Sequence, residues 1–101
     1  MGQRRKEVVS MILDISEARA ALRLDGPEND EIIYSLIEAI PDYIHLATGV
    51  PQKAMHKIPL AKTAAKFILL LWYNAEQSEA ERLQRTIDSL MKALQLLRVK
   101  E

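Results

Sequence analysis

The chain has 101 residues, the length of a single domain, and contains no cysteine, which excludes disulfides, thiolate metal sites and a cysteine nucleophile. Lys and Arg together number 14, as do Asp and Glu, and this balance argues against a dedicated nucleic-acid binder, which usually carries a basic excess. Hydrophobic residues make up 49% of the chain, so we expect part of the apolar surface to be buried against partners.

Residues 1–13 are predicted to form a mobile N-terminal arm, and residues 14–101 a single helical domain. The arm contains the basic run Arg4–Lys6 and a short apolar patch without the small-residue cleavage site of a signal peptide. The longest apolar run, Phe67–Tyr73, falls far short of the roughly 20 residues needed to cross a bilayer. We therefore expect no contact with a membrane.

The first helix is predicted to begin at Ile15. Asp14 is a good N-cap residue, and Glu17 three positions later completes a capping box. Gly26 and Pro27 are expected to end this helix.

A second helix is predicted over residues 28–47, because isoleucine and leucine recur there with the helical period. Acidic residues fall in its first turn, where the helix dipole favours negative charge. Pro41 lies inside the pattern and predicts a kink rather than an end, since the apolar period continues to Ile44. Thr48 and Gly49 are expected to end the helix.

Residues 50–59 are predicted to form a loop between two prolines, followed by a third helix over residues 60–74. The second half of that helix, Phe67–Tyr73, is apolar on nearly every side. Such a helix lies at the centre of a bundle or in an interface, and we expect this one to be the most buried element.

A fourth helix is predicted from a capping box of Ser78 and Glu81 to about Leu97. Leucine and isoleucine recur along it at spacings of four and three, which indicates a narrow apolar seam. The chain carries no strand signal, so the expected fold class is all-α, a small bundle of about four helices.

No motif in the chain predicts catalysis or a cofactor. Acidic residues crowd segment 22–33, but counted from Asp25 its sixth and twelfth positions lack the Gly and Glu of a helix–loop–helix calcium site. His45 and His56 have no third ligand at a metal-site spacing. No serine lies in a strained nucleophile turn, and no glycine-rich phosphate loop is present. We therefore expect no enzyme activity, and no catalytic, cofactor-binding or metal-binding residues.

The order of motifs resembles the tailed-phage head–tail connector, or adaptor, family. That family has a short capped helix ending in L-R-[LI]-D, then an acidic step and a helix of the type DxLIxxLIxAAxxYIxxxTG. The matching positions here are Leu22-Arg23-Leu24-Asp25, Asp30, Ile33, Leu36-Ile37, Ala39, Tyr43-Ile44 and Thr48-Gly49. The stretch from Ala64-Ala65 through FILLLWYN and the leucine pair before Arg98 are similar to later segments of the family.

The resemblance implies a structural protein of a phage or prophage that forms a ring in the virion neck after DNA packaging. The ring would act as an adaptor between the portal protein and the stopper or tail-completion protein. The resemblance further implies a homo-oligomeric, dodecameric ring when assembled, a monomer when isolated, and residence in the host cytoplasm before assembly. It implies no catalysis, no cofactor and no sequence-specific contact with nucleic acid.

Charge gives a first expectation for the contact between subunits. Arg19 and Arg23 lie four positions apart and share one helix face, while Glu28, Asp30 and Glu31 cluster at the start of the next helix. The intervening Gly-Pro turn is expected to point the two groups along different axes, so that they cannot pair fully within one subunit and the basic face of one subunit meets the acidic cluster of its neighbour. These five residues are the candidate subunit interface.

Two other classes of protein remain open. A small helical DNA-binding regulator would use the basic arm and Arg82, Gln84 and Arg85 on the last helix, although Glu79 and Glu81 dilute their charge. A different helical interaction module, such as a toxin–antitoxin or chaperone-like subunit, would account for the same helices. A gel shift at low salt distinguishes the DNA-binding regulator from the adaptor.

Overall fold

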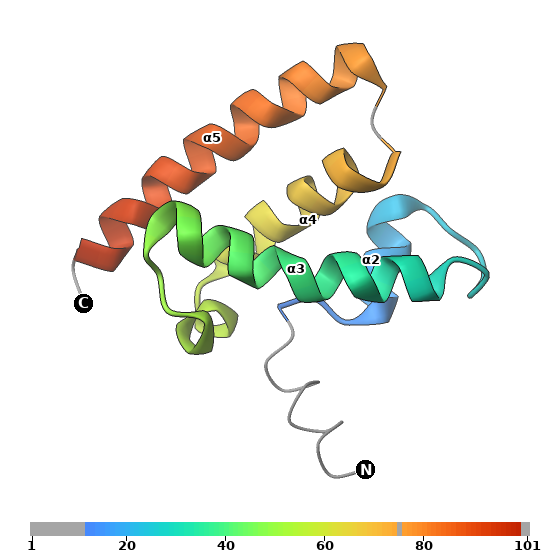
Figure 1. The fold of residues 1–101 in the computed structure, drawn as a ribbon, viewed down its shortest axis with the longest axis horizontal. Coiled ribbons are helices and arrows are strands. Elements are labelled where there is room, and N and C mark those ends of the chain that lie inside the picture. Colours follow the sequence, from blue (N-terminus) through green and yellow to red (C-terminus); the bar gives the residue numbers. More distant parts are fainter. Residues whose placement is uncertain (1–11, 75, 100–101) are drawn as a thin grey trace, which may run out of the picture.

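The computed structural model describes residues 12–74 and 76–99, which form an all-α fold without strands, as predicted (Figure 1). The elements are α2 (Ile15–Leu22), α3 (Asp30–Thr48), the 3-10 helix η1 (Gln52–Lys57), α4 (Pro59–Asn74) and α5 (Gln77–Val99). Residues 1–11 of the predicted arm lie outside the described residues. Its last two residues, Ile12 and Leu13, are buried in the core and so belong to the packed domain.

Helix α4 is the central element of the fold. It contacts each of the other four elements, and Figure 1 shows it between α3 and the long diagonal α5. The molecule measures 42 × 40 × 18 Å. A helix with its side chains is roughly 10–12 Å across and packed helix axes lie about 8–10 Å apart, so a thickness of 18 Å corresponds to about two layers of helices. Most helices of this flat domain therefore keep one face in solvent.

The start of α2 follows the sequence prediction, whereas its end does not. Asp14 accepts a hydrogen bond from the Glu17 backbone N–H (2.7 Å), and the Glu17 carboxylate accepts one from the Asp14 N–H (3.0 Å). The helix ends at Leu22, four residues before the predicted Gly26. Arg23 takes the left-handed conformation (φ 61°), and the Leu24 N–H then bonds the Arg19 carbonyl, which closes a Schellman-type cap.

The left-handed Arg23 gives a stability prediction. A residue with a Cβ is strained in this region by roughly 1–2 kcal/mol, and glycine is not. We expect Arg23→Gly to raise the free energy of unfolding by about 0.5–1 kcal/mol in a urea titration, because part of the gain is lost to the more flexible unfolded chain. Arg23→Ala is the control, since it removes the side chain and keeps the strain. An equal gain in both variants would place the effect in the side chain instead.

Helix α3 begins at Asp30, two residues later than predicted, and continues through Pro41 to Thr48. The Pro41 ring is buried, and residues on both sides of it, such as Ile37 and Ile44, enter the same core. Gly49 ends the helix in the left-handed conformation (φ 83°), with its N–H bonded to the His45 carbonyl at 2.7 Å. The predicted continuation past Pro41 and the predicted C-cap are both confirmed.

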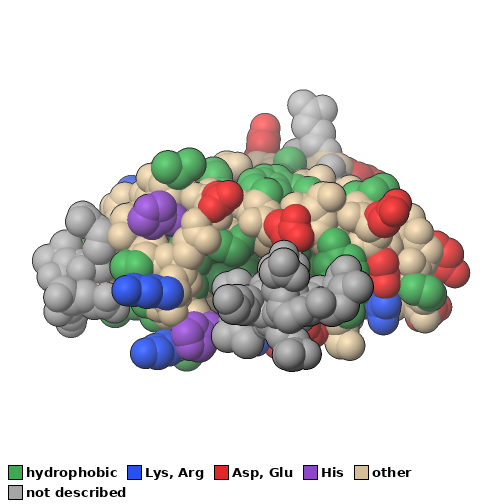
Figure 2. Space-filling view, turned by 60° about the horizontal axis from the view of Figure 1, so that its bottom comes forward, with side chains coloured by type: hydrophobic (Ala, Val, Ile, Leu, Met, Phe, Trp, Pro, Cys, Tyr) green, Lys and Arg blue, Asp and Glu red, His purple; other side chains and the backbone are tan. Residues whose placement is uncertain are grey.

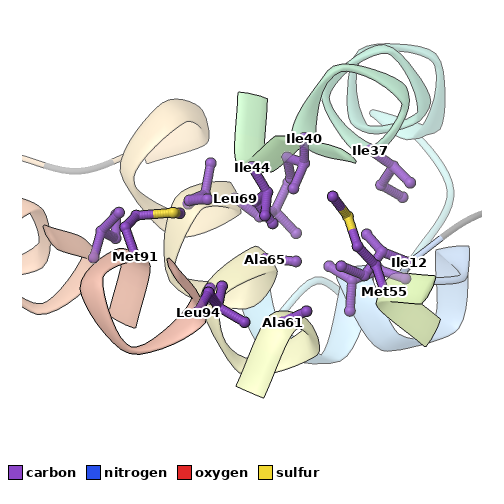
Figure 3. Packing of buried hydrophobic residues seen from close by; sticks show 14 of the residues in the cluster. Ile12, Ile37, Ile40, Ile44, Met55, Ala61, Ala65, Leu69, Met91 and Leu94 are labelled. Atoms are coloured by element: carbon purple, nitrogen blue, oxygen red, sulfur yellow. The ribbon is translucent and has the colours of Figure 1, made fainter. Parts of the chain in front are cut away.

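The core is built around three buried alanines of α4, Ala61, Ala64 and Ala65. Because their side chains are small, neighbouring elements approach the α4 backbone closely. Figure 3 shows side chains of η1 and the N-terminal segment on one side of these alanines, and Met91 and Leu94 of α5 on the other. Further along α4, Ile68 and Leu69 are fully buried, whereas Trp72 is 38% exposed. The helix is thus central, but its last turn reaches the surface.

The segment predicted as a loop, residues 50–59, instead contains η1, which covers one side of the core. Met55 inserts its side chain beside α4, and Val50 is buried with it. The buried Thr48 hydroxyl donates to the Ile44 carbonyl (2.7 Å) and accepts from the Val50 N–H (3.1 Å). His45 Nδ1 bonds the Val50 carbonyl at 2.8 Å, which fixes the chain as it leaves α3.

Helix α5 begins at Gln77, so Ser78 lies inside the helix and the predicted capping box is wrong. The Ala80 N–H donates to the Glu76 carbonyl (2.7 Å), which makes Glu76 the N-cap residue of α5. The predicted seam lies against the core, where Ile87 and Leu94 are fully buried. Gln95 donates to the Ala47 carbonyl (2.9 Å) and joins the C-terminal ends of α3 and α5.

Candidate interaction surface

Two of the five candidate interface residues pair inside one subunit. Arg19 Nε donates to Asp30 Oδ1 at 3.0 Å, and Arg19 Nη2 donates to Asp30 Oδ2, so the guanidinium holds the carboxylate with two parallel bonds. The loop between α2 and α3 therefore brings these two side chains together within one subunit, and the expectation that they point along different axes is wrong for Arg19 and Asp30. This ion pair staples α2 to the first turn of α3.

The other three candidates do not join this pair. Arg23 lines a hollow of about 430 Å³ between α2 and the start of α5, together with Glu79 and Arg82. Since Arg23 lies beyond the helix end, the expected Arg19–Arg23 face is not formed. Glu28 and Glu31 are exposed at the start of α3.

The Arg19–Asp30 pair makes stability depend on pH. Hydrogen bonding from Arg19 lowers the pKa of Asp30 below its ordinary value of 3.8. A carboxyl whose folded pKa is depressed contributes stability above its unfolded pKa and loses it as the pH falls through the folded pKa. We expect Asp30→Asn to unfold at lower urea concentration than the natural chain near neutral pH, and the difference to shrink below about pH 4. Glu31→Gln, in the same turn, is the control; a similar loss there would assign the effect to net charge.

A second ion pair ties α2 to α4. Lys62 Nζ donates to Glu17 Oε2 at 2.6 Å, so Glu17 both completes the capping box and holds the central helix. This bond from Lys62 is the main cause of the lowered pKa of Glu17, followed by its bond with the Asp14 backbone. The residues around Arg19 and Glu17 thus serve the fold of the single subunit.

The surface best suited to a partner is a groove that the charge pattern did not predict. It lies between the start of α3 and the end of α4 and has a volume of about 470 Å³. The groove is lined by Leu24, Asn29, Ile32, Leu36, Trp72 and Tyr73. Most of these side chains are apolar, and Ile32 is 58% exposed. We refer to these six residues as the apolar groove.

Two polar or aromatic contacts hold the groove in shape. Tyr43 packs edge-on against Trp72, with ring centroids 5.5 Å apart and an interplanar angle of 67°. Asn29 Nδ2 donates to the Tyr73 hydroxyl at 2.6 Å, which links the α2–α3 loop to the last turn of α4. Trp and Tyr in a preformed apolar hollow are the residues most enriched at energetically dominant positions of protein interfaces. The arrangement can therefore bind an apolar side chain of a partner.

The sequence carried one signal for the groove. Ile32 and Ile33 are adjacent, so they lie about 100° apart around α3, and one helix cannot point both into the same core. Of the two, Ile33 is buried and Ile32 is 58% exposed. On α4, Trp72 is likewise exposed, although Ile68 and Leu69 one turn earlier are fully buried.

Beyond the opposite end of α3, η1 carries exposed basic side chains, beside which Asp42 of α3 accepts a hydrogen bond from Gln52 Nε2. Leu46 is 83% exposed there, and Lys53, His56 and Lys57 of η1 are exposed close to it along the chain. We call these four residues the basic end. Figure 2 shows most Asp and Glu side chains of one face spread over its centre and right, and Lys and His side chains together at its left.

Within residues 12–74 and 76–99, no three His, Asp or Glu side chains gather as a metal site would require. None of the helices described combines the length and apolar character needed to cross a bilayer. Comparison of the chain with models of protein families, with curated protein sequences and with solved structures finds no match.

Proposed function

We propose that this chain is the subunit of a ring-shaped adaptor in the neck of a tailed phage, placed between the portal protein and the stopper or tail-completion protein. The observation that carries the proposal is the apolar groove, a preformed surface with the composition of a protein-binding site. The assignment to the neck rests on the sequence resemblance over Leu22–Gly49.

The residues of that resemblance have structural roles that suit the proposal. Leu22 to Leu24 form the end of α2 and its left-handed cap, and Thr48 with Gly49 forms the end of α3. Between them, Leu36 lines the groove and Tyr43 supports its Trp72 wall. The matched positions therefore build both the fold and the surface offered to a partner.

Reconstitution with the portal protein of the same phage tests this proposal. When the two are co-expressed and purified, we expect electron microscopy to reveal a second ring stacked on the portal ring. A portal ring that never carries this chain, at any concentration tested, would overturn the proposal. A gel shift with duplex DNA at low salt would then examine the alternative of a DNA-binding regulator through Arg82 and Arg85, which are exposed on α5.

A further inference from the structure

We propose that the basic end of one subunit docks on the apolar groove of the next, with Leu46 as the side chain that enters the groove. This inference deepens and rests on the proposed adaptor function, because it names a second copy of this chain as the occupant of the groove. It replaces the contact that sequence alone suggested, in which Arg19 and Asp30 paired across subunits.

The first support is apolar complementarity. The groove offers Ile32, Leu36 and Trp72 to a partner, and Leu46 is the most exposed of the large hydrophobic side chains described. Moving an apolar side chain out of water is favourable, so both surfaces gain from covering each other. Neither surface is covered within the described subunit.

The second support is charge complementarity. Asp25, Glu28 and Glu31 are exposed and adjoin groove residues along the chain, where Arg23 is the one exposed cation, and Lys53 and Lys57 are exposed at the basic end. A symmetric contact of groove with groove would place acidic groups opposite acidic groups, which is unfavourable. The charges therefore favour a contact between unlike surfaces over a two-fold contact between like ones.

The third support is geometry. Ile32 and Leu46 lie on one helix and are 14 residues apart, about 21 Å along its axis at 1.5 Å per residue. One subunit therefore cannot place its own Leu46 in its own groove. Each copy presents a donor surface at one end of α3 and an acceptor surface at the other, and repetition of such a contact closes into a ring when the rotation per subunit allows.

The first test uses two variants that each disable one surface. Ile32→Glu should prevent binding by the groove, and Leu46→Glu should prevent binding by the basic end. Both side chains are already exposed, so each variant should still fold. In sedimentation velocity, we expect the natural chain to form larger species as concentration rises and each variant alone to remain monomeric. An equimolar mixture should form a dimer and nothing larger, because one intact groove then meets one intact basic end. Tyr34→Glu is the matched control, since Tyr34 lies two residues beyond Ile32 and about 200° around the helix; it should associate like the natural chain.

Charge exchange gives a second test. Reversal of Glu28 and Glu31 to lysine, or of Lys53 and Lys57 to glutamate, should weaken association by up to about fivefold per pair. All four changes in one chain should restore it, because complementarity is then re-established with opposite signs. Salt should weaken the contact of the natural chain without abolishing it, since the charges are screened and the leucine contact is not.

Cross-linking covers the case of weak association. The chain has no cysteine, so Leu46→Cys and Ile32→Cys each introduce a single thiol. A short bismaleimide should cross-link the mixed variants. Two controls, Leu46→Cys alone and Leu46→Cys mixed with Tyr34→Cys, should cross-link to a much smaller extent. If the mixed pair links no faster than these controls, or if either glutamate variant assembles like the natural chain, the contact is wrong.

The outcomes separate this contact from the adaptor function. Mixed dimers without any binding to the portal would retain the contact and remove the neck assignment. Full rings on the portal from both Ile32→Glu and Leu46→Glu would retain the neck assignment and remove the contact.

Discussion

Replacement of Leu69 by alanine is expected to lower the free energy of unfolding by about 2–5 kcal/mol. The Leu69 side chain is fully buried in the core that α4 shares with α3 and α5. Its truncation removes buried apolar surface and leaves a cavity that the surrounding helices fill only in part. A small domain has a total stability of about 5–15 kcal/mol, so this one change should remove a large part of it. Urea titration of the dilute protein, followed by circular dichroism, measures the loss.

Leu96→Ala is the matched control for this prediction. Leu96 is 68% exposed on α5, and the same truncation there should change stability by less than about 0.5 kcal/mol. Leu71→Ala should fall between the two, because Leu71 is only half-buried although it belongs to the apolar run of α4. A loss at Leu69 no larger than the loss at Leu96 would show that α4 does not form the centre of the core.

Thr48→Val is expected to lower stability by about 1–3 kcal/mol even though the two side chains have nearly the same shape. The Thr48 hydroxyl is the acceptor for the Val50 N–H and a donor to the Ile44 carbonyl, and the residue is buried. Valine leaves that backbone N–H without its partner, and an unmade hydrogen bond in the interior carries the full cost of desolvation. Urea titration again gives the size of the effect.

Thr48→Ser separates the hydroxyl from the methyl group. Serine keeps both hydrogen bonds and loses one methyl group, a difference of roughly 0.8 kcal/mol. We therefore expect the serine variant to be more stable than the valine variant. The reverse order would mean that the methyl group, and not the hydrogen bonds, matters at the exit of α3.

The sequence predicted those features of the fold that depend on neighbouring residues. The capping box at Asp14 and Glu17 is a contact over three positions, and the left-handed cap at Gly49 needs only a residue without a Cβ. The interior position of Pro41 in the helix could be predicted because the apolar period continues on both sides of it. Such signals act within one or two helical turns and do not depend on how the helices pack.

The features that the sequence missed depend on packing between distant segments. The Arg19–Asp30 pair forms because the α2–α3 loop turns α2 back onto α3, which the spacing of these residues in the sequence did not predict. The apolar groove joins residues that are far apart in the chain, among them Asn29 and Tyr73, which share a hydrogen bond. A loop was predicted where η1 forms, because no local sequence pattern marks η1. Its position depends on Met55, which is buried in the core.

The order of the helices in space has a consequence for how the chain folds. Helices that follow each other in sequence also pack against each other, with α2 on α3, α3 on α4, and α4 on α5. Contacts between close segments require little loop-closure entropy, and helical domains dominated by them fold in microseconds to milliseconds. A nascent subunit should thus reach its native structure long before it meets a partner, so assembly would proceed from folded units whose encounter, rather than whose folding, sets the rate.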